Sequence, residues 1–152
     1  MKFKFQKLTQ DNVMIIADKW KYDGIYSFYD MTADIDDYKE FVDVSNRNSD
    51  TEYQAIFHNE LVGYFSYEFI NDDIELGLGL RPDYCGKGYG KDFLLQIIAL
   101  IDKKEKYHQL ILNVASFNKR AIKDDESCGF NKTREFMQPT NGSVYPFIEM
   151  RR

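Results

Sequence analysis

Residues 82–91 of this chain read Pro-Asp-Tyr-Cys-Gly-Lys-Gly-Tyr-Gly-Lys, and they decide how the rest of the sequence is interpreted. They lie between a stretch typical of a strand, 74–80, and the apolar pattern of a long helix. Glycines allow another molecule to approach the backbone, and the N–H groups of such a turn, added to the helix dipole, attract an anion. Lys87 and Lys91 add positive charge. The segment therefore predicts a phosphate-binding turn.

Two common phosphate-binding loops do not match it. A Walker A loop requires Ser or Thr after its Gly-Lys pair, whereas Lys87 is followed by Gly88. A dinucleotide fingerprint is spaced Gly-x-Gly-x-x-Gly and comes early in the fold, but here the spacing is Gly-x-Gly-x-Gly and several predicted strands precede it. Coenzyme A remains as the phosphate-bearing ligand, and an ordinary glycine turn is the structural alternative.

The hydrophobic patterns on both sides of this turn predict a mixed α+β fold. Period-two patterns and turn residues mark strands, and helical spacing after a capping residue marks helices. We expect strands at 2–8, 51–57, 61–69, 74–80, 109–115, 131–138 and 144–151 and helices after Thr9, at 35–44, after Gly90 and after Asn118. Gly77 and Gly79 weaken the strand 74–80, which suggests that another molecule lies against it. One strand-helix-strand crossover joins the two halves.

Composition limits the classes of function. A chain of 152 residues and 18.0 kDa suits one domain, and no linker or repeat divides it. The net charge of -5 argues against a nucleic-acid partner and favours a cationic substrate. Two cysteines and two histidines show no metal-ligand spacing, so we expect no metal. Without an apolar targeting or membrane segment, we expect a soluble, cytoplasmic protein.

A second block of residues downstream adds to the glycine turn. It consists of Asn113-Val114, Asn118, Ala121-Ile122 and Cys128-Gly129-Phe130. Together with Gly88 and Gly90, this block resembles the GNAT superfamily of acyl-CoA-dependent N-acetyltransferases over about residues 61–130. The resemblance implies a single domain, 1–152, with the GNAT fold: a central, mixed but mostly antiparallel sheet flanked by helices and splayed where acetyl-CoA enters. Residues 1–60 would build most of the acceptor side, and 61–130 the acetyl-CoA core.

The same resemblance implies the reaction and the cofactor contacts. An amine would attack the acetyl group of acetyl-CoA directly, the acceptor being a small amine or a protein N-terminus or lysine. Backbone groups of Leu78, Gly79 and Leu80 would hold the acetyl and pantetheine portion. The pyrophosphate would rest on the amides of Gly86, Lys87, Gly88, Tyr89, Gly90 and Lys91. Asn118 would contact the pantetheine arm, cap a helix, or do both.

Two positions depart from the family pattern. Cys85 stands at the usual Arg or Gln of the loop, which removes a polar contact but leaves the amides. Asp125 stands where the family commonly has the tyrosine that protonates the leaving thiolate. We keep three interpretations of Asp125: an acid whose pKa burial has raised, a ligand of the cationic amine, or a residue that faces solvent. As a nucleophile, Cys85 lacks a neighbouring histidine in sequence.

A carboxylate must take the proton from the attacking ammonium, and Glu75 is our candidate, with Glu68 and Asp73 as alternatives. Asn113 stands where some relatives carry a catalytic glutamate, and as an amide it can only orient another group. Aromatic residues at 22–29 form either core or lid packing or the walls of the substrate cleft. The acidic residues Asp30, Asp34, Asp36 and Asp37 either attract a cation or open a solvated helix.

Two other functions stay open. One is a non-catalytic acyl-CoA-binding or regulatory module, which would agree with Asp125 at the position of the usual tyrosine acid. The other is an acyltransferase for a longer acyl chain, because the cavity that measures acyl length is built from distant residues. Pairing of two copies through a C-terminal strand would agree with the resemblance.

Overall fold

The computed structural model describes residues 1–152. The strands are β1 (Lys4–Lys7), β2 (Glu52–Phe57), β3 (Glu60–Ile70), β4 (Asp73–Leu80), β5 (Leu110–Ala115), β6 (Asn131–Thr140) and β7 (Ser143–Arg151). The α-helices are α1 (Gln10–Lys19), α2 (Ile35–Val42), α3 (Tyr89–Lys104) and α4 (Lys119–Ser127). Short 3-10 helices are η1 (Gly24–Tyr29), η2 (Met31–Ala33), η3 (Val44–Asn46) and η4 (Pro82–Tyr84).

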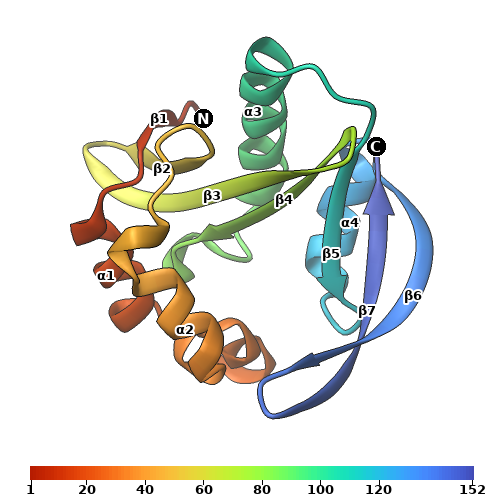
Figure 1. The fold of residues 1–152 in the computed structure, drawn as a ribbon, viewed down its shortest axis with the longest axis horizontal. Helices are drawn as coiled ribbons and strands as arrows, with labels where there is room; N and C mark the ends of the chain where they lie inside the picture. The colour runs from red at the N-terminus through yellow and green to blue at the C-terminus, as the bar shows by residue number, and fades with distance from the viewer.

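All seven strands form one sheet in the order β1-β2-β3-β4-β5-β7-β6 (Figure 1). Every neighbouring pair is antiparallel except β4 and β5, which are parallel because α3 crosses between them. The predicted α+β class, the mostly antiparallel sheet and the central crossover are confirmed. None of the helices combines the length and the apolar character that a membrane-spanning helix requires.

The sheet opens between β4 and β5. Only two residue pairs join these strands, Ile74 with Leu110 and Glu75 with Ile111, although both strands continue beyond them. In Figure 1, β4 and β5 start together near the C-terminus and then diverge. The predicted splay of the sheet is therefore present, and it leaves backbone groups on the facing edges of both strands without a strand partner.

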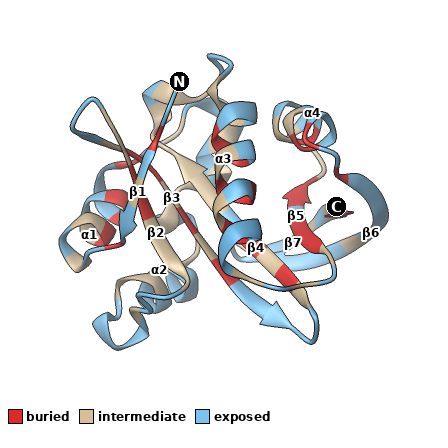
Figure 2. Ribbon diagram, turned by 90° about the horizontal axis from the view of Figure 1, so that it is seen from above, coloured by how far each residue is buried: buried red, intermediate tan, exposed pale blue.

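Helices cover both faces of the sheet. The larger core lies under α3 and α4, where fully buried side chains such as Phe65, Phe93 and Ile97 pack together; Figure 2 shows buried residues concentrated in the middle of the sheet and in α3. A smaller cluster on α1 contains Val13 and Trp20. These two apolar layers hold β3 between α3 on one side and α1 on the other.

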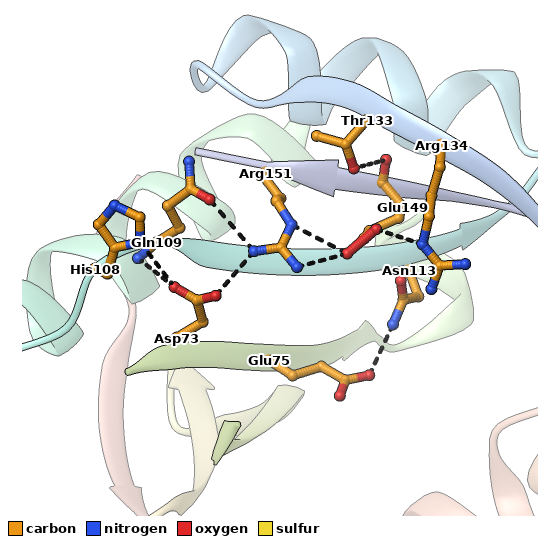
Figure 3. A network of polar contacts seen from close by, with 9 residues as sticks. All are labelled: Asp73, Glu75, His108, Gln109, Asn113, Thr133, Arg134, Glu149 and Arg151. Atoms are coloured by element: carbon orange, nitrogen blue, oxygen red, sulfur yellow. Dashed lines mark hydrogen bonds and ion pairs between the residues drawn. The ribbon is translucent and has the colours of Figure 1, made fainter. Parts of the chain in front are cut away.

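An ionic network holds the closed end of the splay (Figure 3). The Arg151 guanidinium donates to Asp73 at 2.9 Å, to Gln109 at 3.3 Å and to Glu149 at 3.0 Å. Arg134 donates to the other oxygen of Glu149 at 2.7 Å. Because Asp73 begins β4 while Arg151 ends β7, the network ties β4 to the second half of the sheet at the point where the strands meet.

The aromatic segment 22–34 bridges the open end. The Tyr22 hydroxyl donates to the Leu80 carbonyl of β4 at 2.7 Å, and Asn141 of the β6–β7 turn donates to the Phe28 carbonyl at 2.9 Å. The carboxylate of Asp34 accepts from the backbone N–H of Asn141 and also caps α2. The segment thus contacts both halves of the splayed sheet.

Two of the four acidic residues proposed as a cation attractor hold this segment together instead. Asp30 accepts from the backbone N–H of Tyr22 at 2.8 Å, and Asp34 is occupied as described above. Asp36 and Asp37 are exposed in the first turn of α2, where negative charge suits the helix dipole. The interpretation as a helix start is therefore the better one.

We expect two phenylalanines of β3 to contribute very differently to the free energy of unfolding. Phe65 is 0% exposed and Phe69 is 47% exposed. We expect Phe65→Ala to lower the free energy of unfolding by about 3–5 kcal/mol, because it leaves a cavity under α3. Phe69→Ala, the matched control, should change it by less than about 1 kcal/mol. Urea denaturation followed by circular dichroism measures both, and equal losses would contradict this core.

Candidate active site

The open edge of β4 presents backbone groups at every second residue. The N–H of Ile74 donates toward β5, to Gln109, and the N–H of Arg81 donates to Val62 of β3. Since backbone groups alternate between neighbours along a strand, those of Leu76, Leu78 and Leu80 also face the gap between β4 and β5. Leu78 and Leu80 therefore present groups where the sequence placed the acetyl and pantetheine contacts.

Gly79 has a different part from the one expected. Its backbone pairs with Tyr64 of β3, so its N–H and C=O face away from the gap. The glycine is needed because a Cβ there would lie 2.6 Å from Cε1 of the Tyr64 ring. Tyr64 in turn packs on Trp20 and Phe41, and its burial raises its pKa to about 12. The expectation that Gly79 offers its backbone to the cofactor is therefore wrong.

The glycine turn lies at the start of α3. Gly86 and Gly88 have positive φ angles of 72° and 85°, which favour glycine, and Gly88 is the N-cap of the helix. No side chain caps α3, so the first N–H groups of this 16-residue helix are free to meet an anion. Lys87 and Lys91 are exposed beside them. The residues present therefore fit the pyrophosphate of coenzyme A.

A cation that sequence reasoning missed lies over this turn. Nη1 of Arg120, in α4, would be 2.8 Å from a Cβ on Gly86. The guanidinium carbon of Arg120 lies 4.2 Å from the centre of the Tyr26 ring, which fixes its position. No motif signals this contact, because Arg120 and the turn meet only in the folded chain. Arg120 thus supplies the loop with a positive charge, which Cys85 does not provide.

The environment of Cys85 argues against a nucleophile. Its Sγ lies 3.6 Å from the carbonyl oxygens of both Leu80 and Arg81. Burial raises the pKa of the thiol, and although Arg120 opposes this rise, the net shift is upward. A reactive cysteine requires the reverse.

Glu75 lies on the opposite face of the sheet from α3. Its Oε1 accepts a hydrogen bond of 2.7 Å from Nδ2 of Asn113 in β5, just beyond the last β4–β5 pair (Figure 3). Asn113 thus orients Glu75 at the mouth of the splay. Of the alternatives, Asp73 is engaged by Arg151, whose hydrogen bond is the main cause of its lowered pKa. Glu68 is the cross-strand neighbour of Glu75 and is exposed.

Asp125 is buried, with 8% of its surface exposed. The interpretation in which it faces solvent is therefore wrong. Burial raises the pKa of its carboxyl to about 7, with smaller contributions from the nearby charges of Asp124 and Glu126. At neutral pH a large share of the Asp125 side chains is thus protonated, which agrees with the interpretation as a shifted acid.

Asn118 caps α4, as one of its two predicted roles requires. Its Oδ1 accepts from the backbone N–H of Ala121 at 3.1 Å. Its Nδ2 donates at 3.1 Å to the hydroxyl of Tyr29, the last residue of η1. Sequence reasoning placed Tyr29 only in an aromatic segment of uncertain role, and its nearness to Asn118, 89 positions later, has no local signal.

The buried Asp125 carboxyl predicts a pH-dependent stability difference. Its folded pKa, about 7, is raised above the ordinary 3.8, so the folded state binds the proton more tightly and wild-type stability falls as pH rises through this window. Asp125→Asn removes the penalty. Its gain in unfolding free energy should be about 2–3 kcal/mol larger at pH 8 than at pH 5.

Urea denaturation at the two pH values measures this gain. Glu135→Gln, which removes an exposed carboxylate of β6, is the control and should show little difference between them. An Asp125→Asn gain of equal size at both pH values would contradict a raised pKa.

No three His, Cys, Asp or Glu side chains converge in a way that could hold a metal ion. Two surface hollows lie elsewhere, around Tyr107 and His108 near the β3–β4 turn and the end of α3. The chemistry-bearing residues instead collect around the gap between β4 and β5.

Comparisons with known proteins agree with this geometry. Three solved structures have similar folds at low sequence identity. An acetyltransferase (GNAT family) from Bacillus anthracis has a TM-score of 0.76 and 18% identity, covering 100% of this chain and 95% of that chain. Aminoglycoside acetyltransferase AAC(6')-Ib in complex with coenzyme A has a TM-score of 0.77 and 16% identity, covering 99% and 94%. A spermidine N-acetyltransferase SpeG chimera from Vibrio cholerae and hSSAT has a TM-score of 0.74 and 16% identity, covering 99% and 95%.

No curated protein matches the sequence. The family model described as acetyltransferase (GNAT) domain matches residues 4–131, which include the splayed strands, the glycine turn and α4. The chain belongs to the GNAT acetyltransferase family.

Proposed function

We propose that this protein transfers an acetyl group from acetyl-CoA to a primary amine by direct attack. The observation that carries the proposal is the free N-terminus of α3, which opens at a glycine turn beside the unpaired edge of β4. A thioester with a pyrophosphate at its far end matches both features. The family match supports acetyl transfer in general.

In the proposed complex, the amides of residues 86–91 bind the pyrophosphate, and Lys87, Lys91 and Arg120 add positive charge. The outward backbone groups of Leu78 hold the pantetheine end, and its N–H can donate to the oxygen of the acetyl carbonyl as negative charge develops there. Leu80 can offer the cofactor only its N–H, because its carbonyl oxygen accepts a hydrogen bond from the Tyr22 hydroxyl. Oriented donors of this kind stabilise the tetrahedral intermediate.

Glu75 is the proposed general base. An alkyl ammonium with a pKa near 10 must lose a proton before it can attack a carbonyl carbon. Glu75 lies at the mouth of the splay, on the face away from α3, and Asn113 fixes its carboxylate. An amine that approaches from the side of residues 1–60 would meet Glu75 before the thioester.

Asp125 is the proposed acid of the site, which supplies a proton for the last step either directly or through another group. Its burial keeps it partly protonated at neutral pH, as its pKa of about 7 requires. An aspartate with an ordinary pKa would be fully ionised and could not serve.

Calorimetric titration with acetyl-CoA tests the cofactor assignment, with ATP as the control ligand. We expect micromolar binding of acetyl-CoA and much weaker binding of ATP. Gly88→Trp should abolish binding, because the side chain would obstruct the turn at a positive φ. Arg120→Ala should weaken it about tenfold through loss of a charged donor, whereas Lys119→Ala, its exposed neighbour in α4, should not.

No acetyl-CoA binding by the folded wild-type protein would contradict the cofactor assignment. Binding that Gly88→Trp and Arg120→Ala both leave intact would place the cofactor away from the turn. Unchanged circular dichroism spectra of the variants exclude unfolding as the cause of any loss.

Thiol release from acetyl-CoA in the presence of amines tests the reaction. Spermidine and kanamycin are suitable first probes, because proteins of similar fold are described with them. We expect Glu75→Gln to lower kcat/KM about 100-fold or more without changing the Kd for acetyl-CoA. Glu68→Gln, which removes the carboxylate directly opposite on β3, is the matched control and should stay near wild type.

The opposite order of effects would assign the base to Glu68. Tight acetyl-CoA binding without transfer to any amine of a broad panel would favour the non-catalytic binding module over the enzyme.

A further inference from the structure

The hydroxyl oxygen of Tyr29 accepts a hydrogen bond in this structure. Nδ2 of Asn118 donates to it at 3.1 Å, so the phenol oxygen uses a lone pair in this contact. Oδ1 of Asn118 is held by the cap of α4, which fixes the orientation of the amide. The proton of Tyr29 is therefore left to point toward a further acceptor.

The Tyr29 hydroxyl lies at the edge of β5 that faces the gap between β4 and β5. Backbone groups of β5 alternate as those of β4 do: Leu110 pairs with Arg152 beside β7, so Asn113 and Ala115 face the gap. The backbone of Ala115 lies next to the Tyr29 hydroxyl and, with Asn118, favours its ionised form, although burial raises the pKa of Tyr29 overall. Tyr29 thus reaches the gap from the β5 side.

The titratable groups near this hydroxyl are Tyr26 and Asp125. Asp125 holds the position that carries a tyrosine in the family pattern, and it is 8% exposed. Tyr29 is 36% exposed and belongs to a different part of the chain. A phenol of η1 therefore lies at the start of α4, the helix on which the tyrosine of the family pattern is missing.

We propose that the Tyr29 hydroxyl, held by Asn118 at the open edge of β5, is the group that protonates the leaving CoA thiolate. The inference rests on the proposed function and names the donor in its last step. As the C–S bond breaks, the electron pair stays on sulfur, the O–H bond of Tyr29 breaks and an S–H bond forms. The tyrosinate then recovers a proton from solvent or from Asp125, which is its nearby acid.

The Tyr22 hydroxyl, which also lies at the gap, is a poorer proton donor for the thiolate. The Tyr22 hydroxyl donates its proton to the Leu80 carbonyl at 2.7 Å, and its burial raises its pKa further. Donation to a thiolate would require this hydrogen bond to break. Tyr29 requires no such loss, because the bond that positions it is accepted and not donated.

Steady-state kinetics of Tyr29→Phe test the proposal. We expect kcat to fall about 100-fold, as loss of a general acid predicts, with the KM and Kd for acetyl-CoA within about twofold of wild type. Tyr145→Phe is the matched control: its ring packs against Phe28 of η1, with 5.0 Å between the ring centroids, but its hydroxyl has no part in the proposed site. It should keep wild-type kcat.

A second readout separates proton donation from a structural role. The kcat of Tyr29→Phe should rise with the concentration of an imidazolium buffer at constant pH, because a small acid replaces the missing proton donor, whereas wild type should not respond. Tyr29→Phe with wild-type kcat, or with a loss that no buffer acid restores, would overturn the proposal.

The variant Asp125→Asn tests which of the two groups gives its proton directly to the thiolate. If Tyr29 is the immediate donor, Asp125→Asn should lower kcat less than Tyr29→Phe, and the double variant should be no slower than Tyr29→Phe alone, since both groups act on one proton. A large loss in Asp125→Asn alone would make Asp125 the direct donor and overturn the assignment to Tyr29. Absence of turnover in wild type would contradict the proposed function itself.

Discussion

The separation of β4 from β5 after two residue pairs is the constraint on which the rest of the structure depends. A backbone N–H or C=O that leaves a strand pair must find another partner, because an unpaired buried group lowers stability by about 1–3 kcal/mol. The edge groups of Leu78 in β4 and of Asn113 in β5 therefore face the gap without a strand partner and can bind an extended molecule. A flat, fully paired sheet of the same strands would offer no such edge.

Contacts at both ends maintain this separation. At the closed end, Arg151 links Asp73 to Glu149 and keeps β4 and β7 at a fixed distance across β5. Burial raises the pKa of Glu149, but hydrogen bonds from Arg134 and Arg151 more than offset this and leave it lowered. At the open end, the segment 22–34 contacts both halves. The same segment carries Tyr22, Tyr26 and Tyr29, so the element that spans the gap also brings hydroxyls and a ring to it.

The features that sequence predicted are those with a local chemical cause. Glycines at a strand-to-helix turn, period-two strands and a capping asparagine each depend on neighbours a few positions away, and the structure has them where they were expected. The features that it did not predict depend on distant contacts. Arg120 reaches Gly86 because α4 packs beside α3, and Tyr29 reaches Asn118 because η1 bridges the sheet. The expectation for Gly79 and the solvent-facing interpretation of Asp125 were wrong for a similar reason. Which way the backbone of Gly79 faces depends on its pairing with Tyr64, and the burial of Asp125 depends on what covers α4.

A crystal structure of the complex with acetyl-CoA would test most directly whether the gap between β4 and β5 is the cofactor site. We expect the pyrophosphate on the first amides of α3 beside Arg120, the pantetheine hydrogen-bonded to the outward backbone of Leu78, and the thioester sulfur within about 3.5 Å of the Tyr29 hydroxyl. Acetyl-CoA bound elsewhere, with β4 and β5 unoccupied between Leu78 and Ala115, would contradict the account.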